Sequence, residues 1–379
     1  MTCMQLTFPQ FGHEEIKNVQ ECLDSRWVTQ GPFVTKFEQI FAQRHQVGHA
    51  IACTSCTTAL HLAVWALELG PGDEVIVPAF TWITSANCIE FVGAKPIFVD
   101  IDPATFTINP SEIEKVITAR TKAIVVVHLF GLAARMDELT AIAKKNRLHI
   151  IEDAACATGT IYAGKPVGTQ GNLACFSFHP RKVITTGEGG MITTGDSATA
   201  ERIKALRNHG ATGLPAGVTV PGPYTMGSFD ILGNNYRLSD IQAAVGVAQM
   251  GRLDGLLAER YSCAKRYEEL LADVVDFALP TVPEKCGHTY QSFVLRLLEG
   301  GEKRRNCIMD HLAAHGIQTR PGTHAVHRLG YYANKYHLRP KDFPMAALCE
   351  DTTITIPIFP GMTIADQEQV VARLREGLA

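Results

Sequence analysis

Three short segments combine residue types that bind anions or move protons. In the first, CTSCTTALHLAV, four hydroxyl residues (Thr54, Ser55, Thr57 and Thr58) stand at the start of an apolar helical pattern. The first turn of a helix offers free backbone N–H groups and the positive end of the helix dipole, so this turn is a candidate anion site. An ordinary helix cap is the alternative interpretation. It is not a Walker loop, because the sequence contains no GxxxxGK[ST] motif.

The other two segments place an acid and a lysine directly after apolar strand patterns. Asp153 follows the run in IIEDAACATG, and Lys182 follows the run in FSFHPRKVITTGEGG. An acid beside an apolar wall needs a partner, although it could also cap the next turn. A partly desolvated lysine can lose its proton and act as a nucleophile or base, whereas a lone surface lysine extends into solvent.

A flat aromatic ring, Trp82 in PAFTWITSAN, follows a fourth apolar run, where a core position is the alternative. Together the hydroxyl-rich turn, Asp153, Lys182 and Trp82 supply what pyridoxal phosphate requires. Its phosphate binds at a helix N-terminus and its aldehyde needs an amine. Its pyridine nitrogen needs a carboxylate that keeps the ring protonated as an electron sink.

Short apolar runs alternate with helical patterns between about residues 50 and 195. The runs cover 73–80, 94–101, 122–131, 148–155, 173–178 and 189–195, and helical spacing appears at 57–70 and 136–146. This alternation predicts an α/β fold with a mostly parallel sheet covered by helices on both faces. Ligands of such sheets bind beyond the carboxyl ends of the strands, where Asp153 and Lys182 stand.

The rest of the chain predicts a smaller α+β unit. A long helical pattern at 239–274 is followed by strand patterns at 289–299 and 352–359 and by helical patterns at 304–316 and 364–378. Two further helices are predicted near the start, at 13–27 and 33–46. We expect a large cofactor-binding domain at 1–250 and a small C-terminal domain at 251–379.

An ordered series of motifs covers nearly the whole chain: SRWVTQGPFVTKFE, ALHLAVWALELGPGDEVIVP, EDAACATG, FSFHPRKVITTGEGGM, NYRLSDIQAAVG and TIPIFPGMT. With these motifs the sequence resembles the nucleotide-sugar aminotransferases of the DegT/DnrJ/StrS group, which are fold-type I pyridoxal phosphate enzymes. The resemblance implies a seven-stranded, mostly parallel sheet in the large domain.

The resemblance also implies roles for individual residues. Lys182 matches the lysine that bonds to the cofactor and then moves a proton between substrate and cofactor carbons. Asp153 matches the partner of the pyridinium nitrogen, and Trp82 the residue stacked on the ring. The phosphate would be held by Cys56, Thr57 and Ser177.

Asn235, in GNNYR, matches an asparagine that completes the phosphate site of the neighbouring subunit, which implies a homodimer with shared active sites. Cys156 stands where the family commonly has His or Gln near the cofactor's phenolic oxygen, and a thiol is a weaker hydrogen-bond partner. Further residues fall in segments that line the sugar-nucleotide cleft, with surface or core positions as the alternative: Thr29, Gln30, His179, Glu188, Arg237, His288, Arg320, His324 and His327.

The implied activity is transfer of the amino group of L-glutamate, through the pyridoxamine form of the cofactor, to a 3-keto or 4-keto deoxyhexose linked to a nucleotide. The product would be an amino sugar for a surface polysaccharide such as the O-antigen of lipopolysaccharide, or for a glycosylated metabolite. An aminotransferase for a cyclitol or another ketone without a nucleotide is the main alternative. Dehydratases of the family replace the lysine with histidine, and regulators of this fold type usually carry a DNA-binding domain. The presence of Lys182 argues against a dehydratase, and the roughly 50 residues before the cofactor turn argue against a regulator.

Composition agrees with a cytoplasmic enzyme. The chain has 379 residues, 46% of them hydrophobic and 19% charged, which permits a large core. Its 35 basic and 38 acidic residues give a net charge of −3, so we expect neither nucleic acid nor a membrane as a partner. The 11 cysteines are expected to be reduced thiols. Although Cys53 and Cys56 form a CxxC pair, no second pair completes a zinc site, and no metal is expected.

Overall fold

The computed structural model describes residues 3–214, 219–220 and 222–378. Its centre is a seven-stranded sheet in the order β1-β10-β9-β6-β5-β2-β4. Neighbouring strands pair in parallel except along β10, which is antiparallel to both β9 and β1. This confirms the mostly parallel sheet. The strands are β1 (His49–Cys53), β2 (Glu74–Pro78), β4 (Lys95–Val99), β5 (Thr121–Val127), β6 (His149–Asp153), β9 (Leu173–Ser177) and β10 (Gly190–Thr194).

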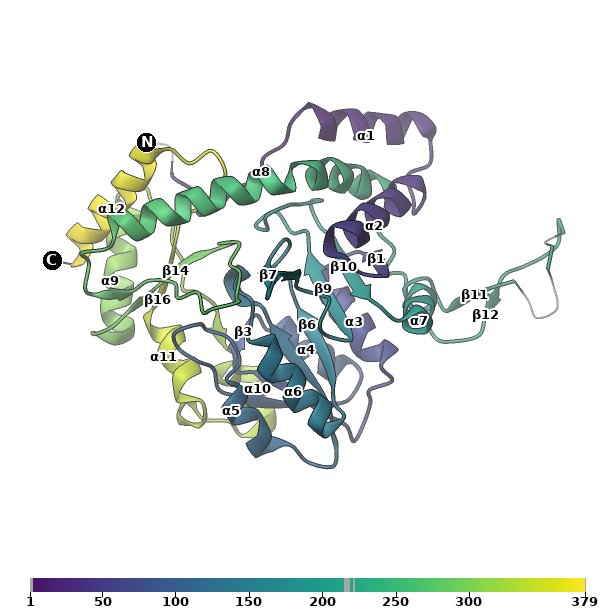
Figure 1. The fold of residues 1–379 in the computed structure, drawn as a ribbon, viewed down its shortest axis with the longest axis horizontal. Coiled ribbons are helices and arrows are strands. Elements are labelled where there is room, and N and C mark those ends of the chain that lie inside the picture. Colours follow the sequence, from purple (N-terminus) through teal and green to yellow (C-terminus); the bar gives the residue numbers. More distant parts are fainter. Residues whose placement is uncertain (1–2, 215–218, 221, 379) are drawn as a thin grey trace.

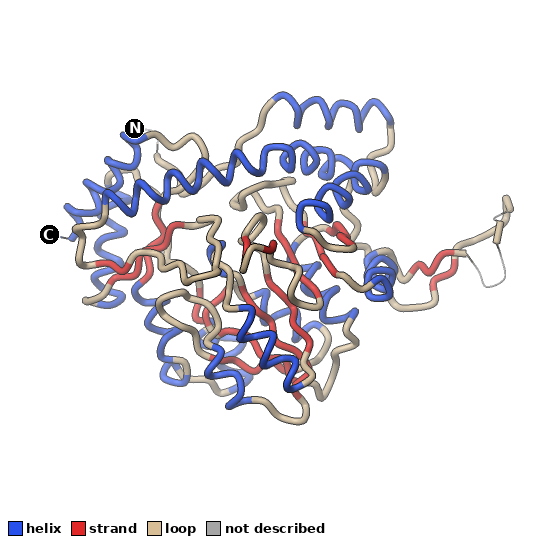
Figure 2. Tube along the Cα trace, viewed as in Figure 1, coloured by secondary structure: helices blue, strands red, loops and turns tan. Residues whose placement is uncertain are grey.

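Helices cover both faces of this sheet, as Figure 2 shows. Because side chains alternate along a strand, Val125 of β5 faces a core cluster that includes residues of α3, α4 and α7, whereas Val126 faces a cluster with residues of α2, α6 and α8. Both faces of the sheet are therefore buried beneath helices. These helices are α2 (Pro32–His45), α3 (Cys56–Ala66), α4 (Thr84–Phe91), α6 (Met136–Asn146), α7 (Ser197–Arg207) and α8 (Asp240–Leu270).

A second, antiparallel sheet forms the core of the C-terminal part. It consists of β13 (Phe277–Ala278), β14 (Phe293–Leu297) and β16 (Thr353–Ile356), and α9 (Gly301–Ala314) and α12 (Ile364–Leu378) pack against each other beside it. The 31-residue helix α8 runs without a break through the predicted boundary at 250. Its first half packs on the large sheet and its second half on the small one, so the helix joins the two units.

The start of the chain packs on this C-terminal part. Met4 N donates to Gly316 O at 2.7 Å, and Ile358 N donates to Leu6 O at 3.1 Å. Helix α1 (His13–Ser25) then lies along α8 (Figure 1). The first residues thus pack on the C-terminal part, although the sequence analysis placed them in the large domain.

A hairpin arm, which we define as residues 208–237 where described, projects from the body of the molecule at the right of Figure 1. It contains the paired strands β11 (Ala211–Gly213) and β12 (Ser228–Phe229). Large apolar side chains are exposed along it, among them Tyr224 at 94%, Leu232 at 81% and Met226 at 80%. Exposure of so many apolar groups on one extension is typical of a surface that another chain covers.

Short strands and helices connect these elements. They are β3 (Phe80–Thr81), β7 (Ile161–Tyr162), β8 (Lys165–Pro166), β15 (His324–Ala325), α5 (Pro110–Ile113), α10 (Gly330–Tyr336) and α11 (Pro344–Thr352). Strand β3 pairs with β15, which links the large sheet region to the C-terminal part. No helix among the described residues is both long and apolar enough to cross a bilayer.

Candidate active site

A cavity of about 330 Å³ opens at the carboxyl ends of the parallel strands. Strands β6 and β9 end at Asp153 and Ser177, and β1 ends two residues before helix α3. Because these ends meet at one edge of the sheet, residues distant in sequence line one space. The predicted site residues that line it are Cys56, Thr57, Trp82, Asp153, Cys156, Ser177, His179, Lys182, Glu188 and Arg320.

The N-terminus of α3 forms one wall of the cavity. The Ser55 side chain accepts from Thr58 N at 3.2 Å and Thr58 Oγ1 accepts from Ser55 N at 3.0 Å, a reciprocal cap that fixes the first turn. Within the described part of the chain, the N–H groups of Cys56 and Thr57 have no acceptor. They point out of the helix start, where an anion binds best.

Gly190 allows this helix start to approach the sheet. A Cβ at position 190 would lie 2.4 Å from the carbonyl carbon and oxygen of Ser55 and 2.7 Å from the nitrogen of Cys56. Real Cβ atoms do not come so close to backbone atoms. Glycine is therefore required here by the close packing of α3 on β10.

Asp153 is a buried carboxylate, with 4% of its surface exposed. Its Oδ2 accepts a hydrogen bond from Ser85 Oγ at 2.6 Å, and its Oδ1 accepts one from Ala155 N at 3.1 Å. Ser85 in turn lies 3.0 Å from Thr81 Oγ1. No basic side chain of the described residues forms an ion pair with Asp153. The carboxylate is thus held in place and lacks a positive partner.

Lys182 projects into the same cavity from the turn after β9. Its backbone N–H donates to His179 O at 2.8 Å, and its Nζ lies 3.1 Å from Cys156 Sγ. Cys56 lies nearby, and burial, with the charge of Asp153, raises the pKa of its thiol well above the usual range. This cysteine therefore stays protonated and contributes its backbone N–H rather than a thiolate.

Aromatic and ionisable side chains surround the cavity mouth. Trp82 is 48% exposed, and its ring centroid lies 5.6 Å from that of His324. His179 Nε2 lies 4.0 Å from Glu188 Oε1; burial lowers the pKa of His179, and Glu188 partly opposes that shift. A neutral imidazole at this place can accept a proton.

Two arginines line the cavity on the side toward the C-terminal part: Arg320, which was predicted, and Arg181, which was not. The Arg320 guanidinium donates to Pro321 O and Gly322 O at 3.2 and 2.9 Å. Gln291 holds the Arg181 backbone through a 2.9 Å bond to its carbonyl. Arg181 adjoins Lys182 in sequence, and that adjacency was the only signal that could have indicated it.

The remaining predicted residues lie outside this cavity within one chain. Thr29 and Gln30 precede α2, where their carbonyls accept from Asp240 N and Trp27 Nε1. His327 is fully buried beside Phe343. Asn235 and Arg237 stand at the base of the hairpin arm, and Asn235 is exposed.

His288 lines a separate small cavity, where burial lowers its pKa to about 3 and its Nδ1 accepts from Tyr290 N at 2.9 Å. His324 lies beside the main cavity, where it pairs with Thr81 and its ring lies next to that of Trp82. The substrate roles suggested for these residues remain predictions.

A second buried acid, Glu152, supports the site from the opposite face of β6. It accepts from His128 Nε2 at 2.9 Å, from Gly168 N at 2.8 Å and from Gly171 N at 2.6 Å. Burial raises its pKa, but these bonds, led by that from His128, outweigh burial and the net pKa is lowered. His128 Nδ1 accepts from Ala134 N at 3.1 Å, so the imidazole joins β6 to the loop after β5.

These features fit pyridoxal phosphate. The two N–H groups of Cys56 and Thr57 lack acceptors and suit its phosphate. Asp153 lacks a cation and suits a protonated ring nitrogen, and Lys182 offers the amine that the aldehyde needs. Trp82 presents an exposed ring face to the same cavity. The cavity thus offers a partner for the phosphate, the aldehyde and the ring nitrogen of the cofactor.

Comparison with known proteins gives a consistent result. The model of the DegT/DnrJ/EryC1/StrS aminotransferase family matches residues 9–375. A GDP-perosamine synthase of Caulobacter vibrioides is 41% identical over 98% of this chain and 97% of its own length. A GDP-perosamine synthase of Escherichia coli O157:H7 is 38% identical over 96% of this chain and 94% of its own length.

A solved structure agrees with the fold and the cofactor. The Streptococcus pneumoniae protein Spr1654, in its PMP form, matches with a TM-score of 0.94 at 27% identity, covering 99% of this chain and 98% of that one. The same protein is also known in a PLP form. A family model that spans almost the entire chain, two relatives near 40% identity and a cavity that fits pyridoxal phosphate lead to one conclusion: the chain belongs to the DegT/DnrJ/EryC1/StrS aminotransferase family and is a pyridoxal phosphate-dependent aminotransferase.

Proposed function

We propose that this enzyme transfers the amino group of L-glutamate to a GDP-linked 4-keto-6-deoxyhexose. The observation that carries the proposal is the convergence of Lys182, Asp153 and the free N–H groups of α3 in one cavity. The choice of a GDP-linked acceptor is supported by the two relatives named GDP-perosamine synthase. The product is a GDP-linked amino sugar, which suits a role in surface polysaccharide.

We assign the cofactor contacts as follows. The backbone N–H groups of Cys56 and Thr57, with the hydroxyl of Ser177, hold the phosphate, and Asp153 holds the ring nitrogen. When bound, pyridoxal phosphate supplies an electron sink that stabilises negative charge on the substrate carbon. Lys182 would offer its amine to the aldehyde and would hold and move the proton at its Nζ. Cys156, 3.1 Å from that nitrogen, lies close enough to orient it.

The cationic side of the cavity suits acidic substrates. The guanidinium-bearing residues Arg181 and Arg320 line this cavity. Guanidinium groups pair well with carboxylates and phosphates. We assign them to the carboxylates of glutamate and, in the second half of the reaction, to the diphosphate of the nucleotide sugar.

We further propose that two copies of the chain share their active sites. Asn235 lies outside the cavity of its own chain, at the base of an arm with exposed apolar side chains. An arm of this shape can reach a partner's cavity and bury those side chains. Asn235 would then add an amide donor to the partner's phosphate site.

The first experiment follows the glutamate half of the reaction. Protein loaded with pyridoxal phosphate is mixed with L-glutamate, and 2-oxoglutarate is measured. We expect one equivalent per site from the wild type and from Lys165→Ala, an exposed-lysine control, and none from Lys182→Ala. A Lys182→Ala variant that forms 2-oxoglutarate at the wild-type rate would refute the role of Lys182.

The second experiment identifies the acceptor. Enzyme converted by glutamate and freed from it is offered keto sugars linked to GDP, UDP or dTDP, 3-keto isomers, and a cyclitol ketone. The proposal requires amination of the GDP-linked 4-keto sugar at a kcat/KM at least tenfold above the others. Preference for a cyclitol ketone, or for a different nucleotide, would overturn it.

A mixing experiment tests the shared site. Lys182→Ala and Asn235→Ala are expected to be weakly active alone. When the two are refolded together, a mixed dimer has one site with both substitutions and one site with neither. Activity well above the sum of the separate variants supports sharing, and activity equal to that sum excludes it.

A further inference from the structure

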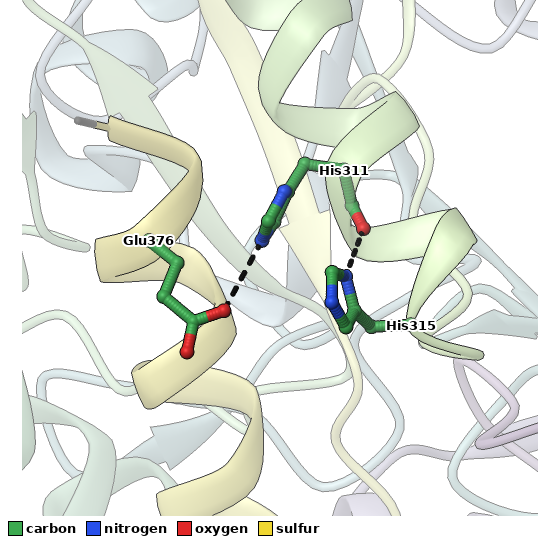
Figure 3. Close-up of side chains that lie close together, drawn as sticks. All are labelled: His311, His315 and Glu376. Carbon is green, nitrogen blue, oxygen red and sulfur yellow. Dashed lines mark hydrogen bonds and ion pairs between the residues drawn. The ribbon is translucent and has the colours of Figure 1, made fainter.

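Two histidines and a glutamate meet between α9 and α12, away from the cofactor cavity. His311 and His315 lie four residues apart on one face at the end of α9, and Glu376 faces them from the last turn of α12 (Figure 3). One ligand atom from each lies within 4.8 Å of the others. None of the three lines the cavity at the sheet edge.

The distance between the first pair fits a metal ion better than a hydrogen bond. His311 Nε2 and Glu376 Oε2 are 3.5 Å apart, and Nε2 is buried without a hydrogen-bond partner in the described residues. In a tetrahedral site with ligands about 2.0–2.1 Å from zinc, two ligand atoms are separated by about 3.3 Å. The pair is therefore spaced for an ion that both atoms bind.

The second histidine is oriented as metal ligands are. His315 Nδ1 lies 2.8 Å from His311 O. Because a carbonyl oxygen can only accept, Nδ1 must carry the proton, which leaves the lone pair on Nε2. Figure 3 shows this second nitrogen on the side of the ring facing Glu376. A backbone acceptor that fixes the tautomer in this way is typical of metal-binding histidines.

Gly377 of α12 lets the His311 ring approach the backbone of that helix. A Cβ on Gly377 would lie 3.3 Å from His311 Cδ2 and 3.5 Å from its Cγ. The imidazole thus packs directly on the helix backbone, which brings the carboxylate of the preceding residue within reach. One group competes for that carboxylate: Arg373 donates to Glu376 at 2.9 and 2.7 Å.

We propose that His311, His315 and Glu376 bind a divalent transition ion, with zinc as the best fit to two imidazoles and a carboxylate. Water would complete the coordination. The ion would tie the end of the chain to α9 and would not take part in transamination. This inference is independent of the proposed sugar substrate.

The test uses untagged, full-length enzyme loaded with pyridoxal phosphate and freed of metal by a chelator. Zn²⁺ binding is measured by calorimetry, and Co²⁺ binding by its visible ligand-field bands. We expect one ion per chain, with affinity at least tenfold lower in His315→Gln. His13→Gln, an exposed-histidine control, should bind as the wild type does. Transamination by His315→Gln should be normal, which checks its fold.

A variant with the opposite expected effect makes the test specific. Because Arg373 occupies the carboxylate, Arg373→Gln should bind Zn²⁺ several-fold more tightly than the wild type. Unchanged Zn²⁺ affinity in His315→Gln would overturn the proposal, as would a Co²⁺ spectrum dominated by thiolate charge transfer. An Arg373→Gln variant that binds no more tightly would also contradict it.

Discussion

Gly190→Ala should abolish tight binding of pyridoxal phosphate without unfolding the protein. The added methyl would lie 2.4 Å from two backbone atoms of Ser55, whereas carbon atoms at rest are about 3.5 Å apart. The first turn of α3 must therefore retreat by about 1 Å. Overpacking of this kind costs about 1–3 kcal/mol of stability.

The effect on the cofactor should be larger than the effect on stability. A 1 Å retreat carries the N–H groups of Cys56 and Thr57 out of hydrogen-bond range of the phosphate. A hydrogen bond to a charged group contributes about 1.5–3 kcal/mol, so loss of two costs about 3–6 kcal/mol. The dissociation constant should rise by about 100- to 20,000-fold.

The assay is an equilibrium titration of apoenzyme with pyridoxal phosphate, followed by quenching of tryptophan fluorescence. Gly195→Ala is the matched control, since it follows the same strand and a Cβ there would meet no atom within 4 Å. Thermal unfolding of the apo forms measures the stability cost separately. If Gly190→Ala binds the cofactor within threefold of Gly195→Ala, the assignment of the phosphate to the α3 turn is refuted.

Three further predictions concern other parts of the molecule. Arg260 is buried and donates to three carbonyls, those of Tyr290, Gln291 and Ile358. Arg260→Met should therefore lower the free energy of unfolding, measured in urea, by about 3 kcal/mol, and a loss below about 1 kcal/mol would contradict this. Burial lowers the pKa of His45 from 6.5 to about 4, so the unfolded chain binds the proton more readily, and stability should fall by about 2 kcal/mol between pH 7 and 4.5. His45→Gln should flatten that part of the pH profile, and an unchanged slope would exclude this source. Cys156 should be alkylated in the apoenzyme and protected by pyridoxal phosphate, whereas exposed Cys307 should react equally in both forms. Mass spectrometry of the labelled peptides measures both reactions. Equal alkylation of Cys156 with and without the cofactor would contradict its place in the site.

The strands that carry the chemistry could be predicted from sequence because each is a dense apolar run. Asp153 and Ser177 end β6 and β9 as expected, and the turn before α3 opens that helix. Strand β1 was missed because HAIAC is short, begins with a histidine and lacks a clear apolar run.

Contacts between segments distant in the chain could not be predicted from the sequence. Ser85 orients Asp153 from 68 positions away, and nothing in its own segment indicates this. His311 and His315 show helical spacing, but Glu376 joins them only because α9 packs on α12. The projection of the hairpin arm could not be predicted either, since it depends on what the body of the protein leaves uncovered.

The pairing of the chain's beginning with its end bears on the order of folding during synthesis. Leu6 and Thr7 line the cofactor cavity. Leu6 is held there by two hydrogen bonds, because its N–H donates to Gln318 Oε1 and its carbonyl accepts from Ile358 N. These partners lie more than 300 residues later in the sequence, so the first residues remain unpaired until those segments have been made. The strands of the large sheet are made earlier, but the cavity at its edge lacks the positioned Leu6 and Thr7 until then. Cofactor bound before those segments are made would therefore occupy a cavity without the wall that Leu6 and Thr7 provide.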